Sequence, residues 1–354
     1  MVVIAVPPGP GLRHRRTSAI VNARSPMSTV STVRGLVEVD ELGQALMHEH
    51  IVNINAEISR DQPELSWGGD RQLALEAIAS KLRDVKAAGI DTIVDATAIG
   101  HGRDIAALRE INAMVDLNII VSTGIYTYDD LPFYFQYRAP ADASARDVMT
   151  EIFVRDIRDG IAGTDVRAAI IKVATDLKGV TPNIERILRA AARAHRETGA
   201  PITTHTQVSE RNGLDQQRIF KEEGVDLTRV IIGHSGDSTD LDYLRELMDA
   251  GSMIGADRFG LYMAPHFPSF EERIETLVRL IEAGYGDRIV LSHDYTAHSD
   301  WFLENPLPVA SEWSFTHVSS AVIPALRERG VTEEQIDALL VHNPRRVFAA
   351  QGAY

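Results

Sequence analysis

The stretch LMHEHIV, at residues 46–52, is the first of eight short runs rich in valine and isoleucine. The runs are apolar without strict alternation, which is typical of parallel strands that are covered on both faces. Longer amphipathic stretches separate them. We therefore predict eight strands, which are LMHEHIV (46–52), DTIVDAT (91–97), NIIVSTG (118–124), AIIKVAT (169–175), PITTHT (201–206), RVIIGH (229–234), SMIGAD (252–257) and RIVLSH (288–293).

Helical segments fill the intervals between these strands, and four end at a glycine or just before one, which is a helix C-terminal signal. Eight strand–helix units between residues 42 and 350 predict one α/β domain, a (β/α)₈ TIM barrel. A doubly wound open sheet is the alternative, but it usually has a glycine-rich phosphate loop after its first strand, and the sequence has none there. The predicted helices are 70–88, 104–116, 145–160, 183–198, 240–250 and 270–284, and the glycines are Gly89, Gly199, Gly251 and Gly284.

The composition narrows the chemistry. The 354 residues include no cysteine, so disulfides and thiolate metal sites are excluded and any metal must be bound by histidines and carboxylates. The formal net charge of -14, from 36 basic and 50 acidic residues, argues against a nucleic-acid partner. No apolar run approaches the ~20 residues that a membrane helix needs. We expect a soluble, cytoplasmic protein without a membrane partner.

Residues 1–34 differ from the rest of the chain, because they contain five arginines and no acidic residue. We interpret them as a disordered tail or as an over-extended start, with Met27 as a candidate first residue. The Arg-rich composition also resembles a transit peptide, whereas a secretory signal would place its basic residues before the apolar stretch. The catalytic domain is then predicted at residues 35–354.

Four histidines and one aspartate coincide with predicted strands. His48 and His50 lie two residues apart in the first strand, so both side chains point to one face. His205, His234 and Asp294 lie at the ends of the fifth, sixth and eighth strands. In a TIM barrel, catalytic groups come from these C-terminal ends. The five residues predict a metal site of nitrogen and oxygen ligands, suited to Zn, Mn, Co or Fe(II).

Lys172 is an unusual residue, because it lies inside the apolar run AIIKVAT. One interpretation is a lysine that snorkels from a strand end or pairs with a buried acid. The other is functional, because burial favours the neutral amine. A neutral amine can take up carbon dioxide to form a carbamate. That group would supply a bridging anion between two metals, which no Asp or Glu of this strand provides.

Five motifs together resemble the phosphotriesterase family of the amidohydrolase superfamily. They are HEH (48–50), IKVAT (171–175), THT (204–206), GHSGD (233–237) and SHD (292–294). The resemblance extends from about residue 34 to the C-terminus, including HNPRR at 342–346, and implies a binuclear metal centre at the C-terminal ends of the barrel strands. It implies that one metal is bound by His48, His50 and Asp294, and the other by His205 and His234. Carboxylated Lys172 and a hydroxide would bridge the two metals.

Within the family, the stretch GIYTYDDLPFYF (124–135) is similar to the phosphotriesterase-like lactonases. This likeness implies that Tyr126 leans over the metal pair and that Tyr128 lines the pocket. Phosphotriesterases proper have a histidine where this chain has Arg258. The sequence departs from lactonase relatives at His101, where they often carry an apolar residue. We expect Phe133, Tyr134 and Phe135 to serve in wall and dimer packing, and the likeness suggests a homodimer.

The implied activity is metal-dependent opening of lactone rings, most of all those of N-acyl homoserine lactones (quorum quenching), with weak phosphotriesterase activity. Asp294 would shuttle the proton, Tyr126 would hydrogen-bond the oxyanion or hydroxide, and Arg258 would order the lid or the ring side of the substrate. The alternatives are a phosphotriesterase (aryldialkylphosphatase), another esterase of the superfamily, or a non-catalytic binding protein, which six filled ligand positions disfavour.

Loop residues complete the expectations. Apolar side chains that could line a channel for the acyl chain are Leu261, Tyr262, Met263, Phe267, Trp301 and Phe302. Three histidines outside the motifs, which we interpret as loop or surface residues, are His266, His298 and His317.

Overall fold

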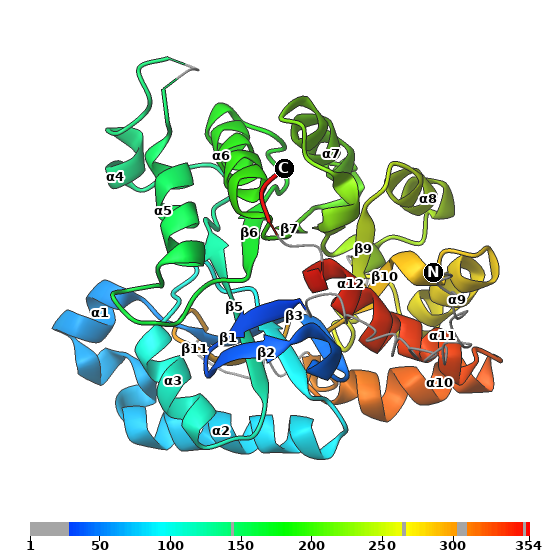
Figure 1. Cartoon of the computed structure of the whole chain (residues 1–354). Coiled ribbons are helices and arrows are strands. Elements are labelled where there is room, and N and C mark those ends of the chain that lie inside the picture. Colours follow the sequence, from blue (N-terminus) through cyan, green and yellow to red (C-terminus); the bar gives the residue numbers. More distant parts are fainter. Residues whose placement is uncertain (1–27, 143–144, 264–266, 303–309, 350–351) are drawn as a thin grey trace, which may run out of the picture.

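A parallel sheet of nine strands forms the centre of the computed structural model, which describes residues 28–142, 145–263, 267–302, 310–349 and 352–354 (Figure 1). The order of the strands is β10-β9-β8-β7-β6-β5-β4-β3-β11. All eight predicted runs form strands of this sheet. The bounds are β3 Ala45–Asn53, β4 Thr92–Asp95, β5 Asn118–Gly124, β6 Ile170–Ala174, β7 Ile202–His205, β8 Val230–Ile232, β9 Met253–Ala256, β10 Ile289–Leu291 and β11 Thr296–Ser299.

The sheet closes into a barrel through β10 and β11. β10 pairs with β9, and β11, a few residues later, pairs with β3. Between them, Asp294 N donates to His48 O at 3.0 Å, and His50 N donates to Tyr295 O at 2.9 Å. The stretch 289–299 therefore contacts both the first and the seventh barrel strand. This confirms the predicted TIM barrel and excludes the open sheet.

Glu49 fixes the position of this closing stretch. Its side chain points away from His48 and His50 and is fully buried. Oε1 accepts hydrogen bonds from Ser292 Oγ at 2.8 Å and from His293 N at 3.0 Å, and Oε2 accepts one from Tyr295 N at 2.9 Å. One carboxylate thereby accepts hydrogen bonds from donors in the short stretch that separates β10 from β11.

Helices surround the sheet (Figure 1). The six predicted helices are confirmed as α2, α3, α5, α6, α8 and α9, with bounds shifted by at most three residues, whereas the other helices were not predicted. Gly89, Gly199, Gly251 and Gly284 all have positive φ, as their role after helix ends requires. The bounds are α1 Ala56–Asp61, α2 Arg71–Ala87, α3 Ile105–Ala113, α4 Phe133–Gln136, α5 Val148–Arg158, α6 Pro182–Thr198, α7 Gly213–Glu222, α8 Leu241–Asp249, α9 Phe270–Glu282, α10 Ile323–Glu328, α11 Glu333–Asp337 and α12 Asn343–Ala349.

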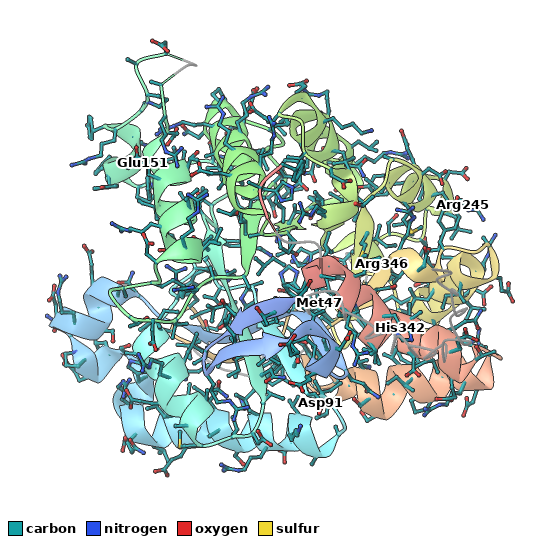
Figure 2. All side chains as sticks on the ribbon, viewed as in Figure 1. Met47, Asp91, Glu151, Arg245, His342 and Arg346 are labelled. Atoms are coloured by element: carbon teal, nitrogen blue, oxygen red, sulfur yellow. The ribbon has the colours of Figure 1, made fainter. Side chains whose placement is uncertain are left out.

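The barrel interior is filled with apolar side chains at the end where the strands begin. Met47, near the centre of the view in Figure 2, belongs to this cluster. Its other members include Ala45, Val94, Ile120, Ile170, Ile231, Met253 and Val290. The barrel is therefore closed by a packed core, and polar chemistry is confined to the opposite end. Among the described helices, none combines the length and apolarity that a membrane crossing requires.

The predicted tail boundary at residue 34 is wrong. Strand β1 (Thr29–Thr32) pairs antiparallel with β2 (Gly35–Glu38), and Val30 is fully buried. Val33 N also donates to Ile119 O of β5 at 2.9 Å. The basic composition concealed a short β-hairpin that covers the barrel core. Residues 1–27, and with them the predictions of a tail and of Met27 as the start, lie outside the described residues.

Candidate metal centre

The predicted ligands converge at the C-terminal end of the barrel. His48 and His50 project from β3, His205 ends β7, and His234 and Asp294 follow β8 and β10. Asp294 Oδ1 lies 3.1 Å from His50 Nε2 and 3.6 Å from His48 Nε2. Asp294 Oδ2 lies 3.7 Å from His234 Nε2. Ligand atoms of His48, His234 and Asp294 all lie within 4.8 Å of one another, a spacing that one metal ion could bridge.

Lys172 and His205 complete the cluster. Lys172 Nζ is fully buried and lies 2.5 Å from His48 Nε2. The ring of His205 packs edge-on against that of His234, with centroids 4.5 Å apart. All six predicted ligands therefore lie at one site. Five of them, all except His48, line a cavity of about 320 Å³.

Two of these ligands have a strained backbone. His234 has φ 59° and Asp294 has φ 53°, in the left-handed region that favours glycine. Both conformations are held by hydrogen bonds, because His234 N donates to Asp257 Oδ1 at 2.9 Å and Asp294 N donates to His48 O. Such strain costs about 1–3 kcal/mol per residue and tends to persist at functional sites. It turns both side chains into the cavity just beyond their strands.

A buried carboxylate that we did not predict as a site residue orients two of the histidines. Asp257 Oδ1 lies 2.9 Å from His234 Nδ1, and Asp257 Oδ2 lies 3.1 Å from His48 Nδ1. When both Nδ1 atoms carry the proton, both Nε2 atoms present lone pairs to the cavity. Burial, followed by the charge of Asp294, raises the pKa of Asp257 well above its ordinary value. Its position right after the seventh strand was no distinctive signal, because an aspartate after a strand is equally common in a turn.

The other two histidines have partners of the same kind. His50 Nδ1 lies 2.9 Å from Thr97 Oγ1, whose hydroxyl donates to buried Asp95. His205 Nε2 lies 2.7 Å from Asp176 Oδ2, which leaves Nδ1 turned toward the cavity side. His50, His205 and His234 are thus hydrogen-bonded through one ring nitrogen, and Nδ1 of His48 lies beside Asp257. In each case the other ring nitrogen is the one available as a ligand.

The protonation states suit metal binding. Burial, helped by the charge of Lys172, lowers the pKa of His48 well below its ordinary value, and burial with the charge of Arg258 does the same for His234. Burial also lowers the pKa of His205 to about 4. Neutral imidazoles are the metal-binding form. Buried Nε2 of His234 has no hydrogen-bond partner among the described residues, so an ion at this point would satisfy it.

Arg258 connects the centre to a second buried acid. Its Nε donates to Asp294 Oδ2 and its Nη1 donates to Asp237 Oδ2, both at 2.9 Å. Burial would lower the pKa of Arg258, but Asp237 and Asp294 together raise it above its ordinary value. Asp237 is also paired with Arg273 at 2.7 Å, and neither of these two residues was predicted as part of the site. The guanidinium therefore acts as a fixed cation behind Asp294.

Aromatic side chains form the wall of the cavity. Tyr126 and Tyr128 share a hydrogen bond through their hydroxyls, and burial raises the pKa of Tyr126 well above its ordinary value. The ring of His101 stacks on that of Tyr126, with centroids 4.1 Å apart, and also contacts the ring of Trp301 at 4.8 Å. All four residues line the cavity together with Phe302. The structure therefore brings Tyr126, Tyr128 and Trp301 together at the cavity, and His101 joins them.

Other loop predictions differ from the structure. Leu261 is buried outside the cavity, and its carbonyl accepts a hydrogen bond from Arg273, so the loop turns this side chain inward. The hydroxyl of Tyr262 shares a hydrogen bond of 2.8 Å with His317 Nε2. His317 is buried, so its interpretation as a loop or surface residue is wrong. His298 stacks on Trp67 at 5.1 Å. Met263 and Phe267 do not line the described cavity, and His266 lies outside the described residues.

Comparison with known proteins decides the family. A profile of the phosphotriesterase family matches residues 28–348. The chain belongs to the phosphotriesterase family. The phosphotriesterase homology protein of Mycobacterium tuberculosis (strain ATCC 25618 / H37Rv) is 50% identical over 330 residues, which cover 93% of this chain and 100% of that protein. The aryldialkylphosphatase of Saccharolobus solfataricus is 39% identical over 319 residues, which cover 88% and 97% respectively.

The solved structures agree with this phosphotriesterase-family membership. The structure of the phosphotriesterase from Mycobacterium tuberculosis matches with a TM-score of 0.87 at 48% identity, over 92% of this chain and 100% of that chain. The resemblance seen in the motifs is confirmed, and the chain is a hydrolase of the phosphotriesterase family. The family profile begins at residue 28, which agrees with the β-hairpin that starts at Thr29.

Proposed function

We propose that this phosphotriesterase-family hydrolase opens lactone rings, with N-acyl homoserine lactones as the preferred substrates. The observation that carries the proposal is the cavity wall. Tyr126 keeps its proton and can donate to a carbonyl oxygen, while Trp301 and Phe302 present large apolar surfaces that are 44% and 42% exposed. The cavity thus has a polar part and an apolar part. The polar lactone ring would bind at the centre, and the acyl chain would lie along the aromatic side chains.

The residues fit two divalent metal ions, zinc first and Co, Mn or Fe(II) as alternatives. His48, His50 and Asp294 would hold one ion, and His205 and His234 the other. Burial lowers the pKa of Lys172 to about 8, which favours the neutral amine that forms a carbamate, the bridging ligand. When bound, the ions supply Lewis acidity toward the ester carbonyl and lower the pKa of water.

The side chains of this chain divide the remaining work. Attack by water on the lactone carbonyl forms one C–O bond and breaks the ring C–O bond. Asp294, held ionised beside His234 and Arg258, accepts the proton of the water and transfers it to the departing alkoxide oxygen. Tyr126 donates to the developing oxyanion. Arg258 fixes the carboxylate of Asp294 against Asp237, so its orientation is maintained during the transfer.

Phosphotriester hydrolysis is the second candidate, because the Saccharolobus relative is named an aryldialkylphosphatase. One experiment separates the two: kcat/KM for a long-chain acyl homoserine lactone is compared with that for paraoxon on the same metal-loaded preparation. We expect the lactone to be the better substrate by several orders of magnitude. The opposite order would overturn the lactonase proposal, and metal analysis of the same sample would identify the ions.

We also propose that the chain forms a homodimer through the surface around α4. Three aromatic side chains are exposed there, Phe133 at 74%, Tyr134 at 50% and Tyr137 at 83%. Exposed apolar clusters of this kind mark interaction sites in proteins. Light scattering after size exclusion should give twice the chain mass of 39.0 kDa, and Phe133→Asp should shift the mass toward one chain. A monomeric wild type would refute this assembly.

A further inference from the structure

A small basic cavity lies at the end of the barrel opposite the metal centre. It has a volume of about 150 Å³, and its lining includes Arg229, Arg288 and Arg346, with Asp287 as the only acid. Arg229 directly precedes β8 and Arg288 directly precedes β10, so the cavity opens where these parallel strands begin. Arg346, labelled in Figure 2, reaches it from α12. Three guanidinium groups thus face one carboxylate in a chain whose net charge is strongly negative.

Arg229 is the decisive residue of this cavity. It is only 8% exposed, and its Nε is buried without a hydrogen-bond partner among the described residues. Among the residues that the structure describes, no carboxylate pairs with the guanidinium of Arg229. The ring of Tyr354 lies 5.1 Å from Cζ of Arg229, a contact that does not neutralise the charge. A buried cation without a counter-ion is costly, so this environment favours the binding of an anion.

The neighbouring arginines are also incompletely neutralised. Arg288 Nη1 donates to the carbonyl of Gly251 at 2.7 Å and has no carboxylate within 4.0 Å among the described residues. Arg346 lies 3.6 Å from Asp287, at the exposed rim. Residues 1–27 contain no aspartate or glutamate, so that stretch offers no side-chain carboxylate either. The three arginines and one aspartate that line the cavity therefore leave an excess of about two positive charges among its lining side chains.

We infer that this cavity binds a small oxyanion of the phosphate class. Phosphate groups carry about −1.5 to −2 charges at neutral pH, which matches the charge excess, and guanidinium groups recognise them through paired N–H donors. The volume is roughly five times the 30 Å³ that a water molecule occupies in the liquid, enough for one such anion with water. The site is separate from the metal centre and from the reaction proposed there.

Thermal unfolding of the metal-loaded full chain tests this inference, with inorganic phosphate as the probe and chloride or acetate at equal ionic strength as references. Phosphate should raise the unfolding temperature of the wild type, as ligands that bind only the native state do. Arg229→Met should weaken the phosphate effect at least tenfold in concentration. In chloride this variant should unfold at or above the wild-type temperature, because the unpaired charge is gone.

Two further variants complete the design. Arg346→Gln removes the rim cation and should weaken the phosphate effect by a smaller factor, while Arg327→Gln, an exposed arginine paired with Glu333, should leave it unchanged. Lactone hydrolysis should be unaffected in all three variants, which separates this site from any phosphate bound at the metals. Equal phosphate effects in wild type and Arg229→Met would overturn the inference. The inference would also be overturned if Arg229→Met lost the same amount of stability in chloride as in phosphate. An acetate effect as large as that of phosphate would overturn it as well.

Discussion

The Nζ atom of Lys172 lies 2.5 Å from Nε2 of His48, and both side chains are buried at the strand end of the barrel. Burial lowers the pKa of this lysine to about 8, so the neutral amine that can react with carbon dioxide is accessible near neutral pH. The contact places the amine of Lys172 directly beside a histidine of β3, and both residues belong to the predicted ligand set.

Lys172→Ala should therefore abolish the activity. We expect kcat/KM to fall by more than about a hundredfold and metal content to fall to one ion or less per chain, because the bridging group is gone. Metal analysis and the lactone assay measure both effects. Lys178→Ala, which removes an exposed lysine paired with Asp129, is the matched control and should change neither. Two bound ions with retained activity in Lys172→Ala would refute the bridging role.

Asp257→Asn should weaken metal binding without removing a ligand. The carboxylate lies between Nδ1 of His48 and Nδ1 of His234, and the amide cannot accept at both of its atoms. Loss of such an orienting partner costs about 10–100-fold in metal affinity. Competition with a chelator gives the affinity, and Asp242→Asn, at a 95% exposed side chain, is the control. Unchanged affinity would show that the histidines are held by packing alone.

His101→Leu should change substrate binding more than catalysis. His101 packs against both Tyr126 and Trp301. Its Nδ1 is buried without a partner among the described residues, and its pKa is lowered by burial and by the charge of His50. Leucine adds apolar surface at the cavity wall. We expect KM for long-chain lactones to fall roughly fourfold, the value of one buried methylene, with kcat within about twofold. His298→Leu is the control, and a higher KM in His101→Leu would contradict the expectation.

The stability of the fold should depend on pH through His195. This residue is fully buried, with Nδ1 2.7 Å from Ala200 O, and burial lowers its pKa to about 4. The unfolded chain binds a proton at about pH 6.5, so the folded state is favoured above that pH and loses this contribution as the pH falls toward 4. The loss amounts to about 3 kcal/mol in the free energy of unfolding.

Urea unfolding between pH 4 and pH 7 measures this contribution, and His195→Gln is the comparison. The variant should be less stable than wild type at pH 7, where the imidazole bonds are intact, and the difference should shrink toward pH 4. A difference that stays constant across this range would show that His195 does not titrate as its environment requires.

The sequence could predict the parts of the structure in which residue types recur at a regular spacing. The spacing of two between His48 and His50, and the recurrence of polar residues after apolar runs, follow from strand geometry, so the ligand cluster was predictable. Asp257 and Asp176 carry no such signal, because an aspartate after a strand is equally common in a turn. Leu261 was placed wrongly, because apolarity does not reveal which way a loop turns when Arg273 binds its backbone.

The hydrogen bonds of Glu49 have a consequence for biosynthesis. They join the first barrel strand to residues 292–295, and Asp294 lies within that segment. A chain emerging from the ribosome can form seven of its barrel strands and still lack this proposed ligand. The metal centre can be completed only after the last strand has docked on the first. Partly synthesised or C-terminally truncated chains should therefore be unable to assemble the full set of ligands, so that hydrolytic activity reports on completed closure of the fold.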